Sequence, residues 1–174
     1  MRYDRLTTPV TGARERAMPQ NCPFCVQSST SSHSVKDLVW AFPHGIAILG
    51  RWQFFRGYCV LFSREHAHEP TDLKAESRDG LMAEMWWLSR AITEVTSPRK
   101  LNYELLGNQV EHPHWHLFPR FSADPEHLKP AWIRIDREEG DPVCLPRLEG
   151  DPAERPTTIS LIRAALTRMG APSA

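Results

Sequence analysis

Three histidines stand at alternate positions in one short segment of the sequence, His112, His114 and His116. Successive side chains of a β-strand point to opposite faces, so a strand here would set three imidazoles in a row on one face. A helix would turn the middle ring away from the other two, and Pro113 disfavours a helix. Pro113 also lacks a backbone donor, which predicts a strand that lies at a sheet edge or is locally irregular at that point.

A row of three imidazoles suits phosphoryl chemistry. A neutral imidazole can attack phosphorus or bind a metal without a further base, because its ordinary pKa of about 6.5 leaves it mostly unprotonated at neutral pH. A protonated neighbour can neutralise phosphate oxygens or protonate a leaving group. A single His-x-His pair would more simply belong to a half-exposed strand or a surface chelate. The third histidine and a cysteine pair upstream favour the catalytic interpretation.

The cysteine pair is Cys22 and Cys25. A gap of two residues lets both thiolates reach one tetrahedral zinc ion at about 2.3 Å. The alternatives are a reduced pair without metal and a thioredoxin-like redox pair, and the second lacks the expected strand and helix context. Cys59 lies in an apolar run and is expected to be a small buried side chain.

The elements that must position these groups are short strands and two helices. Leu81, Leu88 and Ile92 recur at helical spacing with Met85 and Val95, which predicts an amphipathic helix that ends before Ser97 and Pro98. Near the C-terminus, Thr157 or Thr158 is the expected cap of a second helix that ends at Gly170. Apolar and β-branched runs predict strands at 46–49, 58–62, 101–106 and 111–121, and a strand or a short helix leading into one at 36–42. The pattern predicts an α+β domain, with the long helix lying on an antiparallel sheet.

The chain length of 174 residues suits one domain of ordinary size. Its composition predicts an N-terminal arm over 1–20, a core domain over 21–121, and a Pro-rich extension over 122–174 that wraps the surface and ends in a helix. The 21 basic and 21 acidic residues give a formal net charge of zero, which argues against binding of long nucleic acids. The absence of a membrane-length apolar stretch and of a secretory-signal pattern predicts a soluble, cytoplasmic protein with no membrane partner.

The segment 107–120 resembles the signature of the histidine-triad superfamily, His-x-His-x-His followed by two apolar residues. The Pro-Arg that follows it and the segment 102–108 before it are similar to the bacterial diadenosine-polyphosphate-hydrolase-like members. Residues 57–67 resemble an earlier strand of that family and its closing histidine. The resemblance covers about residues 22–121.

This resemblance implies a twisted antiparallel sheet with a long helix packed across it, commonly paired as a homodimer. It implies that His114 is the nucleophile that attacks the α-phosphorus of a nucleotide and becomes a transient nucleotidyl-histidine. His116 would contact the phosphate and its leaving side, and His112 would buttress the nucleophile. The resemblance thus points to a hydrolase acting on a dinucleoside polyphosphate or a nucleoside phosphoramidate.

The resemblance also implies substrate-binding residues. Asn108 and Gln109 stand where the family places polar groups against the phosphate. Gly50 stands where the family usually offers Asn or Asp to the ribose hydroxyls, and Gln53 is the expected substitute. His116 stands where the uridylyltransferase branch has Gln, which favours hydrolysis over nucleotidyl transfer.

In the zinc-containing members of the family, two histidines complete the ligand set of the cysteine pair. Here they would be His66 and His112, with His68 as a competitor for the first position and His44 as a weaker one. Together with Cys22 and Cys25 they would form a closed Cys2His2 site, so the implied zinc is structural.

Two further functions remain open beside the hydrolase. One is a zinc-containing module that binds a nucleotide without turnover. The other is a nucleotidyltransferase, whose product would require an acceptor such as a sugar phosphate.

Overall fold

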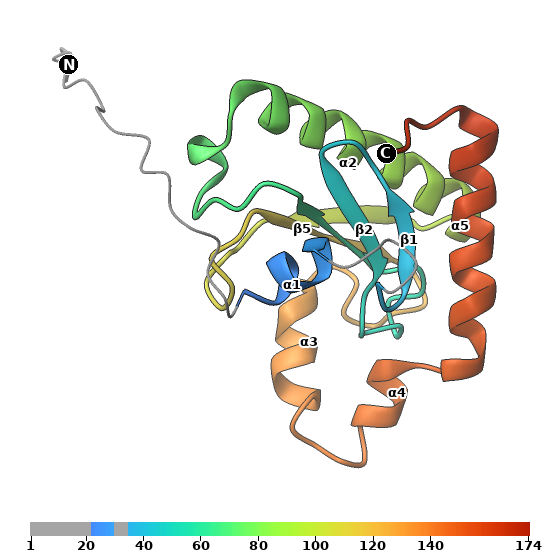
Figure 1. The fold of residues 1–174 in the computed structure, drawn as a ribbon. Helices are drawn as coiled ribbons and strands as arrows, with labels where there is room; N and C mark the ends of the chain where they lie inside the picture. The colour runs from blue at the N-terminus through green and yellow to red at the C-terminus, as the bar shows by residue number, and fades with distance from the viewer. Residues whose placement is uncertain (1–21, 30–34) are drawn as a thin grey trace, which may run out of the picture.

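A computed structural model describes residues 22–29 and 35–174, so the arm predicted over 1–20 lies outside the described residues. Figure 1 shows a twisted five-stranded sheet with helices on both faces. The strands are β1 (Leu38–Ala41), β2 (Gly45–Leu49), β3 (Cys59–Ser63), β4 (Lys100–Glu104) and β5 (His114–Arg120). Every neighbouring pair is antiparallel, and the order across the sheet is β1-β2-β3-β5-β4. The α+β fold and the approximate positions of the strands are confirmed.

The long helix α2 (Ala75–Thr96) covers one face of the sheet (Figure 1). Its predicted apolar positions Leu81, Leu88 and Ile92 are buried in one cluster with inward side chains of the strands, Ala47, Leu49, Cys59, Leu61, Leu101 and Leu117. The helix ends at Ser97, which adopts a left-handed conformation with φ 47° directly before Pro98. Within the described residues, no helix has the length and apolar character needed to cross a membrane.

The opposite face of the sheet is covered by two shorter helices, α1 (Pro23–Ser29) and α3 (Ala131–Glu138). Phe24 of α1 stacks on Phe62 of β3, with ring centroids 4.6 Å apart. Ala131 and Ile135 of α3 are fully buried in a cluster that includes Tyr58. Helix α4 (Leu145–Glu149) closes that cluster, and single 3-10 turns occur at η2 (Pro70–Asp72) and η3 (Pro152–Glu154).

The C-terminal helix α5 (Arg155–Met169) packs beside α2 and along the outer strand β1 (Figure 1). Ile162 and Leu166 are fully buried in the same cluster as α2. Arg163 donates hydrogen bonds to the carbonyls of Leu38 and Val39, so it satisfies part of the edge of β1. The predicted end at Gly170 is confirmed by its φ of 73°.

The predicted threonine cap of α5 is wrong. The helix begins at Arg155, so its N-cap is Glu154, three residues before Thr157, and Glu154 makes no side-chain capping bond. Pro156 stands in the first turn, where a missing N–H costs nothing and a fixed φ favours the helix.

Candidate functional site

The row of histidines begins at the first residue of β5. The strand starts at His114, directly after Pro113, and it lies between β3 and β4 rather than at an edge. Pro113 still takes part in the sheet through its carbonyl, which accepts a hydrogen bond from the Ser63 amide at 3.0 Å. Of the two outcomes expected from a proline here, the local irregularity is therefore the one observed.

The three imidazoles lie on the face of the sheet covered by α1. The His114 and His116 rings are 4.8 Å apart, and their cross-strand partners on β3 are Phe62 and Val60. His112 precedes the strand, and Phe24 contacts both its ring, at 5.4 Å, and that of His114, at 4.8 Å. Trp115 and Leu117 pack in the cluster below α2 instead, as alternation along a strand requires.

His114 makes a hydrogen bond through one ring nitrogen, and its other ring nitrogen has no partner among the described residues. Its Nδ1 lies 2.6 Å from the carbonyl oxygen of His112, which can only accept, so Nδ1 carries the ring hydrogen. The lone pair is therefore on Nε2. Burial lowers the pKa of His114, against the opposing effect of this hydrogen bond, and the side chain is 6% exposed.

His116 is held in the opposite way. Its Nδ1 lies 2.7 Å from the hydroxyl of Tyr58, which is buried. Burial raises the pKa of Tyr58 far above its ordinary value, so the phenol keeps its proton. That hydroxyl has no other partner among the described residues, and donating to Nδ1 is the arrangement that leaves no buried donor unpaired.

The hydrogen of the neutral His116 ring is consequently on Nε2. Burial lowers the pKa of His116 to about 3, with a smaller contribution from His114, so the ring is uncharged at neutral pH. Trp132 of α3 meets it edge to face at 5.0 Å, and His116 stays partly exposed. His116 is thus a neutral donor beside a neutral nucleophile.

His112 faces a different group of side chains. Its Nε2 lies 2.8 Å from the carbonyl oxygen of Ser63 and therefore carries the hydrogen. Its Nδ1 lies 3.1 Å from Nδ1 of His66, 3.4 Å from Sγ of Cys22 and 3.7 Å from Sγ of Cys25. Cys25 Sγ and His66 Nδ1 are 3.3 Å apart. All four ligand atoms lie within 4.8 Å of one another.

This cluster fits a tetrahedral zinc ion. Zinc bonds of about 2.0–2.3 Å would set neighbouring ligand atoms about 3.3–3.8 Å apart, close to the separations found here. The hydrogen that His112 donates to a backbone carbonyl leaves its other nitrogen free for metal, the usual arrangement for a metal-bound imidazole. With four protein ligands, a tetrahedral zinc ion here would have no coordination position left for water or substrate.

The competing histidines lie outside the cluster. His68 pairs with Glu111, at 2.9 Å, and His44 pairs with Glu84, at 3.0 Å. Within the described residues, His66 is therefore the histidine that joins the two cysteines and His112.

The expected phosphate-binding residues lie at the same end of β5 as the histidines. Asn108 and Gln109 are exposed on the connection between β4 and β5, beside Gly107 with its φ of 74°. Their side chains make no hydrogen bond with the described residues, so both are free to contact a ligand.

Gln53 has a different environment. Its Nε2 donates to the carbonyls of Gly50, at 2.8 Å, and Tyr58, at 3.0 Å, and its Oε1 accepts from the Gly57 amide at 3.0 Å. These bonds close the loop between β2 and β3. Both Nε2 hydrogens are thus used, whereas Oε1 has a second lone pair that could accept from a ribose hydroxyl.

Tyr58 is a functional residue that sequence reasoning missed, because the run 58–62 predicts only a strand. The structure shows why the Tyr58 ring requires a glycine at position 50. A Cβ added to Gly50 would lie 2.2 Å from Cε1 of that ring. The glycine is thus what lets the tyrosine ring pass and reach His116. The only signal in the sequence is an aromatic residue directly after Gly57, which is too common to single out.

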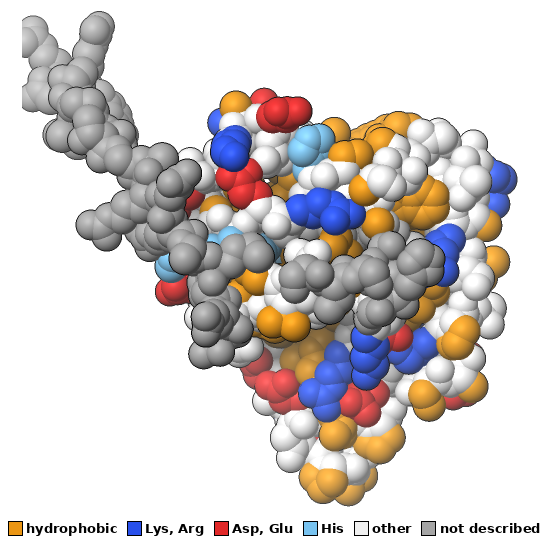
Figure 2. Space-filling model, in the orientation of Figure 1, with side chains coloured by type: hydrophobic (Ala, Val, Ile, Leu, Met, Phe, Trp, Pro, Cys, Tyr) orange, Lys and Arg blue, Asp and Glu red, His pale blue; other side chains and the backbone are white. Residues whose placement is uncertain are grey.

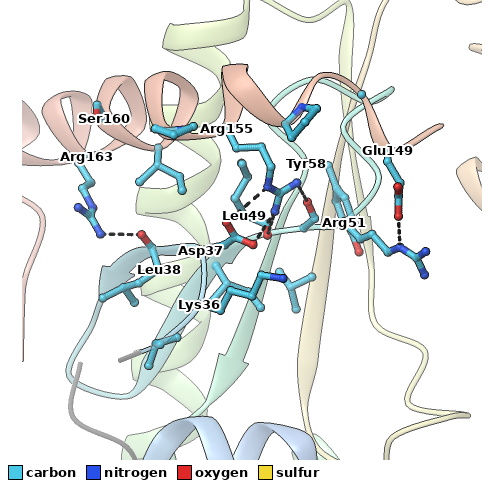
Figure 3. A pocket seen from close by; sticks show the side chains of 18 of the residues that line it. Lys36, Asp37, Leu38, Leu49, Arg51, Tyr58, Glu149, Arg155, Ser160 and Arg163 are labelled. Atoms are coloured by element: carbon cyan, nitrogen blue, oxygen red, sulfur yellow. Dashed lines mark hydrogen bonds and ion pairs between the residues drawn. The ribbon is translucent and has the colours of Figure 1, made fainter. Parts of the chain in front are cut away.

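A cavity of about 1370 Å³, shown in Figure 3, is lined in part by Tyr58 and Val60. Both residues neighbour His116, Tyr58 by its hydrogen bond and Val60 as the cross-strand partner. One wall is formed by residues 35–38, by Ile48 and Leu49 of β2, and by Gly50 directly after that strand. The other is formed by residues 149–163, from the end of α4 into α5. The cavity therefore lies between the sheet and the C-terminal part of the chain.

Comparisons with known proteins give matches at the level of structure. No protein-family model and no curated protein sequence matches the chain. A histidine triad protein from Bradyrhizobium japonicum has a TM-score of 0.61 and 26% identity, over 79% of this chain and 97% of that one. A zinc-bound histidine triad family protein from Mycobacterium smegmatis has a TM-score of 0.62 and 22% identity, over 87% of this chain and 96% of that one. A Hit-like protein from Bartonella henselae, described as involved in cell-cycle regulation, has a TM-score of 0.64 and 14% identity, over 86% of this chain and 99% of that one.

The chain therefore has the fold of histidine triad proteins, as expected from its sequence. These neighbours support the superfamily and leave the branch within it open.

Proposed function

We propose that this chain is a histidine-triad hydrolase that cleaves a nucleotide at its α-phosphate, of the diadenosine-polyphosphate-hydrolase-like kind. The observation that carries the proposal is the pair of opposite hydrogen bonds on β5. His114 gives its Nδ1 hydrogen to the His112 carbonyl and keeps a free Nε2, while His116 accepts at Nδ1 and keeps a hydrogen on Nε2. A nucleophile and a hydrogen-bond donor thus stand side by side.

The reaction proposed has two steps. Nε2 of His114 attacks the α-phosphorus, and the bond from phosphorus to the bridging oxygen or nitrogen breaks, so that the leaving group departs with the electron pair. A bridging oxygen departs as a phosphate anion, and a bridging nitrogen takes a proton from the solvent and departs as the amine. The His116 Nε2–H hydrogen-bonds to the leaving atom. Water then attacks the nucleotidyl-histidine, the P–N bond breaks, and a nucleoside monophosphate is released with a proton from the water.

Four further side chains have proposed roles, three of them at the substrate. Asn108 and Gln109 are the phosphate contacts, because they are exposed at the end of β5 where the triad begins. Gln53 is the proposed ribose contact, through the second lone pair of its Oε1. Tyr58 is a positioning residue that acts through His116.

Cys22, Cys25, His66 and His112 would hold a structural zinc ion. Bound there, the metal would cross-link α1, the segment after β3 and the segment before β5. The metal would then hold the His112 ring, and the carbonyl of the same residue orients His114 through a hydrogen bond. The zinc-bound protein from Mycobacterium smegmatis is consistent with this proposal.

The proposed partner is a nucleotide, and the proposed assembly is a homodimer in the cytoplasm. The formal net charge of zero argues against a long nucleic acid as a partner.

The test is to incubate the full chain with a diadenosine polyphosphate and with an adenosine phosphoramidate and to measure release of adenosine monophosphate. Release by the wild type that is lost in His114→Ala, with nucleotide binding retained by calorimetry, is the expected result. Binding without release from any such substrate would favour the module without turnover. A product that forms only with an added sugar phosphate would favour the nucleotidyltransferase.

A further inference from the structure

The cavity beside Tyr58 is lined by more positive than negative side chains. Within the part of the chain that the structure describes, the lining has four basic and two acidic groups, Lys36, Arg51, Arg155 and Arg163 with Asp37 and Glu149. Figure 3 shows Lys36, Asp37 and Arg155 near the centre of the cavity, with Arg163 on one side and Arg51 with Glu149 on the other. Figure 2 shows basic side chains, with acidic ones beside them, on the face of the molecule seen in Figure 1. The first turn of α5 also borders the cavity, and the N-terminal end of a helix carries partial positive charge.

Both carboxylates of the cavity are already paired. Asp37 accepts from Arg155, with Oδ2 2.8 Å from Nη2 and Oδ1 3.4 Å from Nε. Glu149 accepts from Nε of Arg51 at 2.7 Å. Arg155 additionally donates to the carbonyls of Leu49 and Gly50, so it joins α5 to the end of β2.

The groups left for a ligand are donors. The Lys36 ammonium makes no hydrogen bond with the described residues, and the side chain is exposed. Among the described residues, Arg51 makes a hydrogen bond only through its Nε, so its two terminal nitrogens have no partner there. Its guanidinium lies over the Trp52 ring, 4.3 Å from the centroid, which restrains it at the rim.

We propose that this cavity binds a second, non-reacting phosphate group of the substrate, held by Lys36 and Arg51. This inference rests on the proposed function. A phosphate offers several acceptor oxygens and negative charge, which match an ammonium and the fork of a guanidinium. A volume of about 1370 Å³ exceeds the range of about 300–1,000 Å³ that is usual for ligand pockets, so it has room for a group beyond a mononucleotide.

A second phosphate has two possible sources, an ester on the ribose or the polyphosphate chain itself. Calorimetric titration of the full chain distinguishes them with three ligands that cannot be cleaved at an α-phosphoanhydride. These are adenosine monophosphate, adenosine 3′,5′-bisphosphate and adenosine 5′-(α,β-methylene)diphosphate. We expect at least one of the latter two to bind about five- to tenfold more tightly than the monophosphate, and the tighter one identifies the source.

The double variant Lys36→Gln/Arg51→Gln should lose this preference and keep its affinity for the monophosphate. Lys100→Gln removes a charge from exposed strand β4, away from the cavity, and should keep the preference. Thermal melting of each variant checks that its fold is intact.

Three results overturn the inference. If all three ligands bind the wild type equally, the phosphate site does not exist while the proposed nucleotide site remains. If the double variant keeps the preference, the site lies elsewhere. If no nucleotide binds at all, this inference and the proposed function are both wrong.

Discussion

The two histidines at the start of β5 have the same type of side chain and different hydrogen-bonding. His114 donates from Nδ1 to a backbone carbonyl, and His116 accepts at Nδ1 from a buried tyrosine. Because a neutral imidazole has a single ring hydrogen, these bonds decide which atom is available on the other side of each ring. One ring therefore presents a lone pair and the other presents an N–H. This difference is what assigns separate roles to two neighbouring residues.

Tyr58→Phe tests the assignment of His116. Removing the hydroxyl leaves Nδ1 of His116 without its donor, so the ring is free to change tautomer. We expect kcat to fall by about tenfold, since about 1.4 kcal/mol is within the range of one hydrogen bond to a buried group. The loss should be greater for a phosphoramidate than for a substrate whose leaving group needs no hydrogen bond, such as a nitrophenyl ester.

The comparison of leaving groups separates positioning from packing. A variant that merely loosens the core would lower the rate on both substrates equally. Equal loss on both would therefore contradict the role of Tyr58, and so would wild-type rates on the phosphoramidate.

The alternation of the histidines was readable from the sequence, and the hydrogen bonds that divide their roles were not. Strand geometry alone places residues 112, 114 and 116 on one side. The tautomer of His116, by contrast, depends on Tyr58, which reaches it from the loop before β3 only because Gly50 has no Cβ in the way. Such a contact depends on the packing of segments far apart in the sequence.

Among the elements, α1 is the one that links the metal cluster to the catalytic face. It begins at Pro23, where a proline is favoured, and a spacing of three residues puts Cys22 and Cys25 at one end of the helix. Phe24, between them, stacks on Phe62 and covers one side of the His114 ring. Sequence reasoning predicted the shared metal but no helix, because a seven-residue helix has too few apolar positions to show a period.

Loss of zinc should therefore weaken the attachment of α1. We expect the purified protein to contain about one zinc ion per chain and Cys25→Ser to contain almost none. If about 2–4 kcal/mol of stability is lost, the melting temperature falls by about 5–15 °C for a chain of this size. Elemental analysis and thermal melting measure the two effects.

Cys144→Ser is the matched control, because Cys144 is part-exposed and outside the cluster. It should keep both its zinc and its melting temperature. A wild-type protein that holds no zinc when freshly purified, or a Cys25→Ser variant that holds as much as the wild type, would contradict the metal assignment.

At the scale of the whole molecule, the C-terminal part of the chain belongs to the same core as the sheet. Ile162 and Leu166 of α5 are buried with Leu88 of α2, and residues 149–163 form a wall of the cavity. The sequence showed the apolar stripe of this helix, but a stripe does not specify its partner. The prediction for 122–174 therefore identifies a Pro-rich segment that ends in a helix, but it does not foresee that this helix packs into the core.

The homodimer remains a prediction, and α2 offers a surface for it. Met82 and Trp86 lie one turn apart on that helix and are 45% and 52% exposed. Light scattering of the full chain should give twice the monomer mass, and Trp86→Glu should shift it toward the monomer. Val143→Glu replaces another exposed apolar residue, away from α2, and should leave the dimer intact. A monomeric wild type would contradict the prediction.

The most direct measurement on the central claim is capture of the covalent intermediate. The full chain is mixed with a diadenosine polyphosphate, quenched within milliseconds in alkali, where phosphoramidates survive, and digested for mass spectrometry. The account predicts one adenylyl group on the peptide that carries His114, attached at that residue and absent from His114→Ala. Turnover without any such adduct, or an adduct on another residue with His114→Ala still active, would contradict it.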